Sequence, residues 1–213
     1  MQKRRVIAYI DGFNFYFRRL RNKPYRWLDL VALFDALFPD DEVVMVKYFT
    51  ARVSGKFDAA KPARQDVYLR ALKTLPRLEI IEGQYFTKIA PRRLFEPHTN
   101  LDGEIVNFAQ IWNSDEKGSD VNLGSHLIND AWEDAYDVAA VLTNDSDLAV
   151  PMQMASKRGK TITLLHPDNN ASKNLMRCAS HSLHIHDKYL VATQLPLTVM
   201  TSRGDVIRKP DSF

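Results

Sequence analysis

Short apolar segments alternate with helical segments along most of the chain, and this alternation limits the choice of fold more than any other feature. Strands are predicted over 6–10, 43–49, 78–86, 138–143 and 161–165. Helices are predicted between them over 13–21, 28–37, 63–75, 119–132 and 146–158. Strands joined by helices form a mainly parallel sheet, because each helix crosses one face of it. We therefore expect an α/β fold, a doubly wound, Rossmann-like three-layer sandwich.

Residues 87–113 do not follow this alternation. Pro91, Pro97 and the turn sequence Asn100-Leu101-Asp102-Gly103 interrupt them, and 104–112 has the character of an added strand. We expect a hairpin inserted over 87–113, within one domain that spans 1–194. Residues 195–213, which contain Pro and Gly, are expected to form a C-terminal tail.

The composition excludes several classes of protein. A single cysteine, Cys178, excludes an intrachain disulfide framework and an all-cysteine metal site. No apolar run approaches the roughly 18–20 residues that cross a membrane, and too few apolar residues precede Asp11 for a signal peptide. We therefore expect a soluble, cytoplasmic protein without a membrane partner. The sequence lacks Gly-x-Gly-x-x-Gly and Walker-type loops, which disfavours nucleotide binding by those devices.

The formal net charge of +3 is unevenly distributed. Residues 94–148 contain one Lys or Arg and twelve acids, whereas 1–26 contain eight and one, and 56–93 contain nine and four. An acidic centre therefore lies between basic flanks. A solvated acidic face is the simpler explanation, and the flanks are also what an RNA partner requires.

Acidic residues follow two predicted strands where each strand ends. Asp11 ends the first strand, with Asn14 one turn later, and Asn144-Asp145-Ser146-Asp147 follow the strand over 138–143. The carboxyl ends of parallel strands share one edge, so these carboxylates converge if the strands are neighbours. Clustered carboxylates repel unless a cation neutralises them, and hard oxygens suit Mg²⁺ or Mn²⁺. The alternative is that they only cap a helix and open a turn.

Further candidates lie outside these two strand ends. Asp120 is in the first turn of the predicted helix over 119–132, where the helix dipole favours an acid in any case. Lys117 is the one base of the acidic stretch, and it is either a phosphate contact or a salt-bridge partner. The candidate RNA contacts are basic side chains, Arg18, Arg19, Lys61, Arg64, Lys88, Arg92 and Arg93, and aromatic ones, Tyr68, Tyr85 and Phe86. Taken singly, each is equally explained as a surface charge or a core aromatic.

Three motifs together resemble the NYN domain family, in its LabA-like branch, of the PIN-like nucleases. They are Asp11-Gly12-Phe13-Asn14, Glu116-Lys117-Gly118-Ser119-Asp120-Val121 and Thr143-Asn144-Asp145-Ser146-Asp147-Leu148. The resemblance implies a PIN-like sheet and a metal-dependent ribonuclease site lined by Asp11, Asn14, Asp120, Asp145 and Asp147. Relatives often carry a further acid where this sequence has His126, which bears on the second metal position and on the charge of the site.

The sequence therefore predicts a metal-dependent endo- or exoribonuclease that acts on single-stranded RNA with one or two Mg²⁺ or Mn²⁺ ions. The expected metal ligands are Asp11 and Asp145 directly, and Asp120 and Asp147 partly through water, while Asn14 positions water or phosphate. The expected substrate contacts are Ser146, Asn144, Lys117, Arg18, Arg64 and Lys88. Two alternatives stay open, an RNA-binding or regulatory adaptor with a weakened site and a phosphohydrolase of small substrates, and so does a homo-oligomer.

Overall fold

The computed structural model describes residues 2–168, 170–211 and 213. Within them, seven strands form one sheet in the order β4-β3-β2-β1-β5-β6-β7. Only β3 and β4 pair antiparallel, and the other neighbours in this sheet are parallel. The strands are β1 (Arg5–Asp11), β2 (Glu42–Ala51), β3 (Leu78–Thr99), β4 (Ile105–Lys117), β5 (Val138–Leu142), β6 (Thr161–His166) and β7 (His181–His184).

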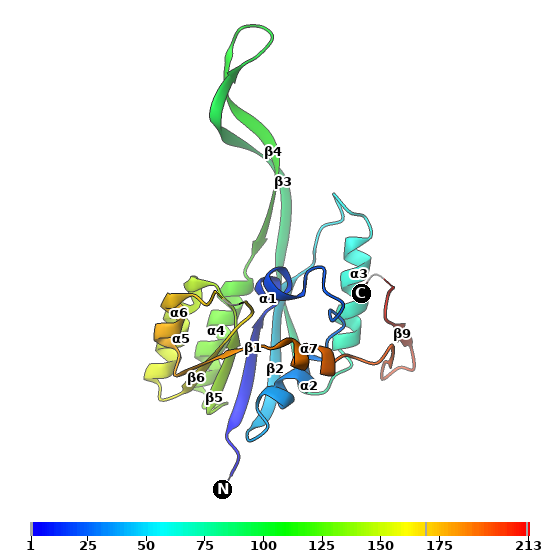
Figure 1. The fold of residues 1–213 in the computed structure, drawn as a ribbon, viewed down its shortest axis with the longest axis vertical. Coiled ribbons are helices and arrows are strands. Elements are labelled where there is room, and N and C mark those ends of the chain that lie inside the picture. The colour runs from blue at the N-terminus through cyan, green and yellow to red at the C-terminus, as the bar shows by residue number, and fades with distance from the viewer. Residues whose placement is uncertain (1, 169, 212) are drawn as a thin grey trace.

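Helices cover both faces of the sheet (Figure 1). They are α1 (Gly12–Phe15), the π-helix η1 (Tyr16–Leu20), α2 (Leu30–Leu37), α3 (Lys61–Leu72), α4 (Ser119–Trp132), the 3₁₀-helix η2 (Ser146–Leu148), α5 (Ala149–Lys157), α6 (Lys173–Cys178) and α7 (Asp187–Ala192). Strands β8 (Thr198–Met200) and β9 (Val206–Arg208) form a separate small hairpin. No described helix is long and apolar enough to cross a membrane.

Two hydrophobic clusters show that the sheet is the middle layer. Side chains alternate between the faces of a strand, so Val6 and Ala8 of β1 belong to one cluster, while Ile7 and Tyr9 belong to the other. Helices α2, α3 and α7 contribute to the first cluster, and helices α4, α5 and α6 contribute to the second. The predicted three-layer α/β sandwich with a mainly parallel sheet is therefore confirmed.

Two predicted helices are divided in the structure. The helix expected over 13–21 consists of α1 and the π-helix η1, and it ends at Leu20 because the backbone of Arg21 leaves the helical region, with ψ 128°. The helix expected over 146–158 begins as the 3₁₀-helix η2 and becomes α-helical at Ala149. Pro151 fits here because its missing N–H falls within the first turn of α5.

The predicted hairpin is present, and its strands are longer than expected. Strand β3 continues from the sheet to Thr99, and β4 returns to Lys117, so residues 84–117 form a long arm that stands away from the body (Figure 1). At its tip, the side-chain oxygen of Asn100 accepts hydrogen bonds from the N–H groups of Asp102 and Glu104. The division of the chain into a domain over 1–194 and a tail stays a prediction.

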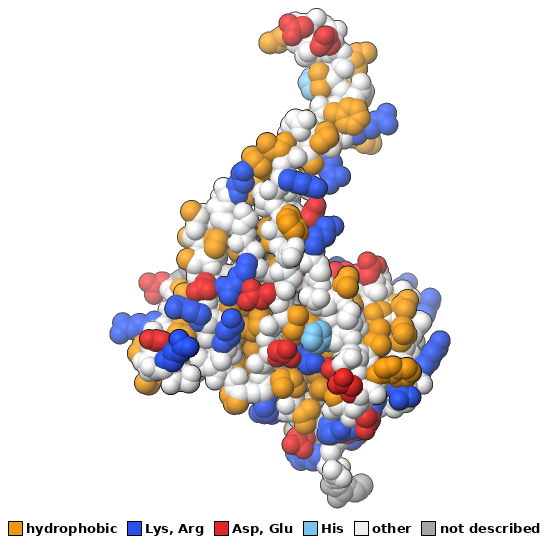
Figure 2. Space-filling view, turned by 180° about the vertical axis from the view of Figure 1, so that it is seen from behind, with side chains coloured by type: hydrophobic (Ala, Val, Ile, Leu, Met, Phe, Trp, Pro, Cys, Tyr) orange, Lys and Arg blue, Asp and Glu red, His pale blue; other side chains and the backbone are white. Residues whose placement is uncertain are grey.

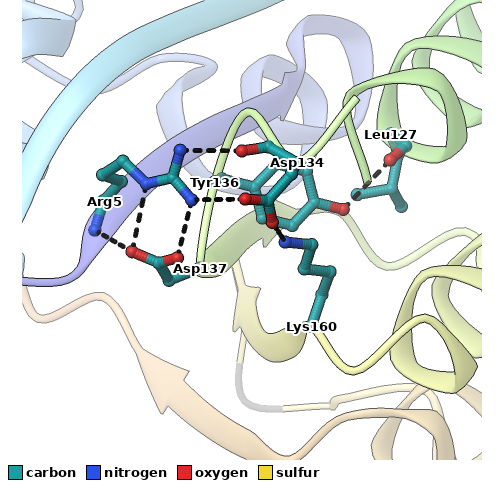
Figure 3. Close-up of polar contacts among 6 residues, drawn as sticks. All are labelled: Arg5, Leu127, Asp134, Tyr136, Asp137 and Lys160. Atoms are coloured by element: carbon teal, nitrogen blue, oxygen red, sulfur yellow. Dashed lines mark hydrogen bonds and ion pairs between the residues drawn. The ribbon is translucent and has the colours of Figure 1, made fainter. Parts of the chain in front are cut away.

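Ion pairs hold together the amino ends of β1, β5 and β6 (Figure 3). Arg5 donates to Asp137 through its backbone N–H and through its guanidinium group, both at 2.8 Å. Asp134 pairs with Arg5 at 3.3 Å and also with Lys160. The hydrogen bonds from Arg5 lower the pKa of Asp137 to about 2. The acids at this edge of the sheet are therefore neutralised by neighbouring cations.

Candidate active site

The carboxyl ends of β1 and β5 lie side by side and bring the first two acids together. Ile10 is opposite Leu142 in the parallel register, so Asp11 and Thr143 follow at adjacent strand ends. The Thr143 hydroxyl donates to Oδ2 of Asp11 at 2.9 Å and accepts from the N–H of Asp145 at 3.0 Å. Thr143 therefore links the two carboxylate-bearing segments. Sequence reasoning did not assign it a role, although a hydroxyl residue ending an apolar strand before an Asn-Asp pair was a usable signal.

Asn14 is fixed by two hydrogen bonds. Its N–H donates to Oδ1 of Asp11 at 2.9 Å, and its Oδ1 accepts from the N–H of Asn144 at 3.1 Å. Because the backbone donor identifies Oδ1 as the oxygen, the NH₂ group is the end of the side chain that is left to donate. The tight turn requires Gly12, since a Cβ atom there would lie 2.6 Å from the carbonyl oxygen of Phe49.

Asp120 reaches the same edge from the turn that joins β4 to α4. Gly118 caps the helix in the left-handed conformation, with φ 96°, which glycine adopts at little cost. Asp120 follows in the first turn of α4. Oε1 of Glu116 accepts from the N–H of Ser119 at 3.0 Å, so Glu116 is held beside this turn. Glu116 belongs to the second of the three motifs, although the sequence did not indicate it as a site residue.

Five acids interact through their charges, and we call them the acidic cluster: Asp11, Glu116, Asp120, Asp145 and Asp147. Burial raises the pKa of Asp11 to about 6; hydrogen bonds from Asn14 and Thr143 lower it, and the charges of Asp120 and Asp145 raise it further. The pKa of Asp120 is raised by burial and then by Asp145, Glu116 and Asp147. The side chains are therefore close enough to repel one another.

The donor chemistry of the acidic cluster fits a hard divalent cation. Carboxylate oxygens are the ligands that Mg²⁺ and Mn²⁺ prefer, and a cation would relieve the repulsion that raises the pKa of Asp11 and of Asp120. In the described part of the chain, no three His, Cys, Asp or Glu side chains are arranged to hold a metal ion as they stand. Ligation would therefore require the carboxylates to draw closer through side-chain rotation.

His126 lies in a different network. Its Nδ1 is 3.3 Å from Nζ of Lys47, which forms a buried ion pair with Asp130 at 2.7 Å. Tyr9 also donates to Asp130, at 2.6 Å. The ring of His126 packs edge-on against Phe49. His126 therefore lies beside the ion pair of Lys47 and Asp130.

The predicted substrate contacts at the strand ends lie around the acidic cluster. Asn144 holds a neighbouring segment: its NH₂ group donates to the carbonyl oxygen of Asn170 at 2.8 Å, and its Oδ1 accepts from the N–H of Ser172 at 2.6 Å. Ser146 is exposed at the start of η2, and Lys117 is exposed at the end of β4. Their roles stay predictions.

The other predicted contacts are more dispersed. Arg18 is ion-paired with Asp168 at 2.9 Å, and Arg64, on α3, is ion-paired with Asp58. Lys88 is exposed on the arm. Tyr68 is buried in the core, with 8% of its surface exposed. The suggestion that Tyr68 stacks on bases is therefore wrong.

A row of aromatic rings leads from α1 to the base of the arm. Phe17 stacks on Phe13 with ring centroids 6.2 Å apart, and Phe13 stacks on Tyr85, also at 6.2 Å. The guanidinium group of Arg21 lies 5.8 Å from the Phe17 ring. Tyr85 is paired across the arm with Glu116 of the acidic cluster. We call Phe13, Phe17 and Tyr85 the aromatic stack; sequence reasoning proposed only Tyr85, although aromatics four residues apart after Asp11 were a signal.

An open hollow of about 680 Å³ includes Asn170, the residue that Asn144 holds. Its lining includes two cations, Lys173 and Arg177, together with Ala171 and Met176. The acidic cluster therefore has basic groups on the β5–β6 side of the sheet as well as on the arm side.

Comparisons with known proteins agree with this architecture. The chain is 32% identical to 6-hydroxy-3-succinoylpyridine 3-monooxygenase HspA of Pseudomonas putida (strain DSM 28022 / S16), over 98% of this chain and 75% of the relative. The fold is similar to the crystal structure of VPA0982, a protein of unknown function from Vibrio parahaemolyticus RIMD 2210633, with a TM-score of 0.54 and 17% identity over 91% of this chain and 98% of that one.

The family model of the NYN domain matches residues 5–186, a range that runs from the start of β1 past the end of β7 and contains all three motifs. The LabA-like branch within the family stays a prediction. With a match of this extent, the chain belongs to the NYN domain family, a nuclease-like family of the PIN-like group.

Proposed function

We propose that this chain is a metal-dependent ribonuclease that hydrolyses phosphodiester bonds in single-stranded RNA. The observation that carries the proposal is the acidic cluster at the carboxyl edge of β1 and β5, where burial and neighbouring charges raise the pKa of Asp11 and of Asp120. Asp11 caps α1 and Asp145 caps η2, each through one carboxylate oxygen. Capping does not account for the raised pKa of Asp11 and of Asp120, because both values mean that the surroundings disfavour the charge in the absence of a cation. Membership of a nuclease-like family supports the same function.

The residues of the cluster take distinct roles in this proposal. Asp11 and Asp145 would hold Mg²⁺ or Mn²⁺ directly, and Asp120 and Asp147 would hold it partly through water. When bound, such an ion would supply water activation and offset charge on the phosphodiester oxygens. The NH₂ group of Asn14, whose oxygen is held by Asn144, donates to a phosphate oxygen or to the attacking water. Thr143 holds Asp11 and the Asp145 backbone in place.

Single-stranded RNA is the substrate that the surroundings favour. Aromatic rings beside cations form the usual platform for unpaired bases, because every base has a face that can stack. Phe17 is 50% exposed at one end of the aromatic stack, with Arg21 next to it. Lys117 on the arm side, and Lys173 and Arg177 on the other, offer cations to the phosphate backbone.

A monooxygenase is the second candidate, and the 32% identity to HspA over 98% of this chain favours it. Such an enzyme would hydroxylate a pyridine ring with one atom of O₂, and the other atom would leave as water at the expense of two electrons from a reductant. The reductant would have to bind without a Gly-x-Gly-x-x-Gly loop, which the sequence lacks. The acidic cluster has no evident part in that reaction.

The deciding experiment is cleavage of end-labelled single-stranded RNA by the full chain with Mg²⁺ or Mn²⁺. EDTA is the metal control. Asp145→Asn removes an acid of the cluster, and Asp137→Asn is the matched substitution at the opposite, ion-paired edge of the sheet. We expect cleavage by the unsubstituted chain and by Asp137→Asn, and none with EDTA or with Asp145→Asn.

Other outcomes select the alternatives. RNA binding without cleavage in either metal would favour the adaptor, and turnover of small phosphoesters alone would favour the phosphohydrolase. Consumption of O₂ with 6-hydroxy-3-succinoylpyridine and a reduced nicotinamide cofactor, unaffected by Asp145→Asn, would favour the monooxygenase. Cleavage that survives Asp145→Asn would place the activity elsewhere or in a contaminant.

A further inference from the structure

The arm is the least covered part of the molecule. Beyond Gly83, β3 pairs with β4 alone, so the arm is a ribbon of two strands that projects from the body (Figure 1). A two-stranded ribbon is marginally stable in water, and stability normally requires a third strand or another surface against one face. In the described structure, the outer part of the arm has neither.

Large apolar side chains are exposed along the whole arm. Phe95 and Leu101 are fully exposed, at 99% and 107% of their reference surfaces. Six more are between 41% and 71% exposed: Phe86, Ile89, Ile105, Phe108, Ile111 and Trp112. The register places Ile89 and Trp112 on one face of the ribbon and Phe86 and Ile111 on the other, so both faces carry exposed apolar side chains. Apolar side chains exposed in such number usually mark an interaction site.

Outside the base of the arm, where Asp115, Glu116 and Lys117 lie, the charges are separated into two groups. The basic group, Lys88, Arg92 and Arg93, lies midway along β3, and the acidic group, Glu96, Asp102 and Glu104, lies toward the tip. Figure 2 shows acidic side chains at the tip and Lys and Arg side chains below it. Among the described residues, no ion pair includes any of these six side chains.

This arrangement does not suit RNA over the whole arm. The acidic group would repel phosphates, so RNA would contact only the basic group and leave Phe95 and Leu101 in water. The outer part of the arm, with three basic side chains at one height and three acidic ones at another, is instead complementary to itself when a second arm runs in the opposite direction.

We propose that the arm binds the arm of a second copy of this chain, side by side and antiparallel, about a two-fold axis. The acidic group of each arm faces the basic group of the other, and exposed apolar side chains within the overlap, Phe95 and Phe108 among them, are covered. An isologous contact of this kind uses the same patch on both copies. The shared segment from residue 88 to residue 99 is about 40 Å long at roughly 3.3 Å per residue, which leaves the two bodies at opposite ends.

Sedimentation velocity of the full chain tests this contact, and charge reversal makes the test specific. The unsubstituted protein is expected at twice the chain mass of 24.5 kDa. One variant, Asp102→Lys with Glu104→Lys, makes the tip basic; the other, Arg92→Glu with Arg93→Glu, makes the middle acidic. In the homodimer of either variant, like charges face each other, so its dissociation constant should rise about tenfold or more. An equimolar mixture should form a heterodimer, because both contacts are then between opposite charges.

A matched control reverses two cations outside the arm. Lys23→Glu with Arg203→Glu changes the net charge as much as the second arm variant does, at exposed positions of the body, and should leave the dimer unchanged. Circular dichroism checks that each variant is folded.

Three results would overturn the proposal: a monomer at all concentrations up to about 100 µM, a dimer that neither arm variant weakens, or two monomeric variants that do not associate when mixed. A monomer whose arm variants lose affinity for single-stranded RNA would identify the arm as a nucleic-acid surface instead. None of these readouts depends on RNA cleavage, so the dimer proposal and the proposed ribonuclease activity are tested independently of each other.

Discussion

The two ends of β1 and β5 carry acids in opposite electrostatic states. At the amino ends, Arg5 lowers the pKa of Asp137 to about 2. At the carboxyl ends of the same strands, burial raises the pKa of Asp11 to about 6. The first arrangement favours the folded chain, while the second opposes it until a proton or a cation arrives. An edge that retains unfavourable charge despite neighbouring basic residues is the edge where function is expected.

The largest expected difference between the edges is in activity. Asp145→Asn removes a metal ligand of the proposed site and should lower the rate of RNA cleavage roughly 10³-fold. Asp137→Asn should leave the rate within about threefold, because Asp137 lies at the opposite edge of the sheet. Single-turnover cleavage of labelled RNA measures both. Equal losses in the two variants would mean that the edges do not differ in function.

The dependence of stability on pH should have opposite signs at the two edges. The folded pKa of Asp11 is about 6, above its ordinary 3.8, so the folded chain gains stability as the pH falls from 7 to about 4. The gain is at most about 3 kcal/mol, at 1.36 kcal/mol per unit of pKa shift. The folded pKa of Asp137, about 2, lies below 3.8, so its contribution is complete above pH 3.8 and is lost as the pH falls toward 2.

Thermal unfolding without metal measures this difference. The stability of Asp11→Asn should lack the gain between pH 7 and 4 that the unsubstituted chain shows. The stability of Asp137→Asn should lack the loss below pH 3.8. A chain whose stability between pH 7 and 4 is unaffected by Asp11→Asn would show that Asp11 is not destabilised by burial.

A smaller effect is expected from Asp120→Asn. The raised pKa of Asp120 means that its surroundings disfavour the charge, although the start of α4 favours an acid. Removing the charge should raise the Tm of the metal-free chain by about 2–4 °C at pH 7.5. Differential scanning calorimetry in EDTA tests this, and a lower Tm would contradict the repulsion within the acidic cluster.

An effect of similar size and opposite sign is expected from Asp137→Asn at neutral pH. Its side chain is 40% exposed, and Asn keeps one oxygen for the Arg5 N–H, so the Tm should fall by only a few degrees. The direction matters more than the size: Asp→Asn should destabilise the amino edge and stabilise the carboxyl edge. Two shifts of the same sign would remove the contrast between them.

The sequence predicted that the segments carrying Asp11 and Asp145 lie side by side, because the ends of neighbouring parallel strands share one edge of the sheet, while the roles of these residues stay predictions. Asp11 and Asp145 each follow an apolar strand, and the parallel pairing of β1 with β5 places these strand ends side by side. The family and the fold class were also recognised from the motifs and the alternation of elements, and both are confirmed.

Other features depend on contacts between distant segments and were not predictable. Glu116 joins the acidic cluster only because β4 continues to Lys117 and ends beside α4. Tyr68 was considered a stacking residue, but α3 packs it into the core, where it donates to the carbonyl oxygen of Leu28. The length of the arm was not predicted because Pro91 and Pro97 are typical turn signals. Pro91 fits in a strand whose other edge is unpaired, and Pro97 lies where the register shifts between Arg93 and His98.

The central claim is that the carboxyl edge holds a divalent cation, and calorimetric titration with Mn²⁺ tests it most directly. The unsubstituted chain and Asp137→Asn should bind Mn²⁺ at pH 7.5 with the same affinity, while Asp145→Asn should bind at least about tenfold more weakly. Binding should also weaken as the pH falls through 6, where Asp11 takes up a proton. No binding by the unsubstituted chain, or equal binding by all three proteins, would contradict the account.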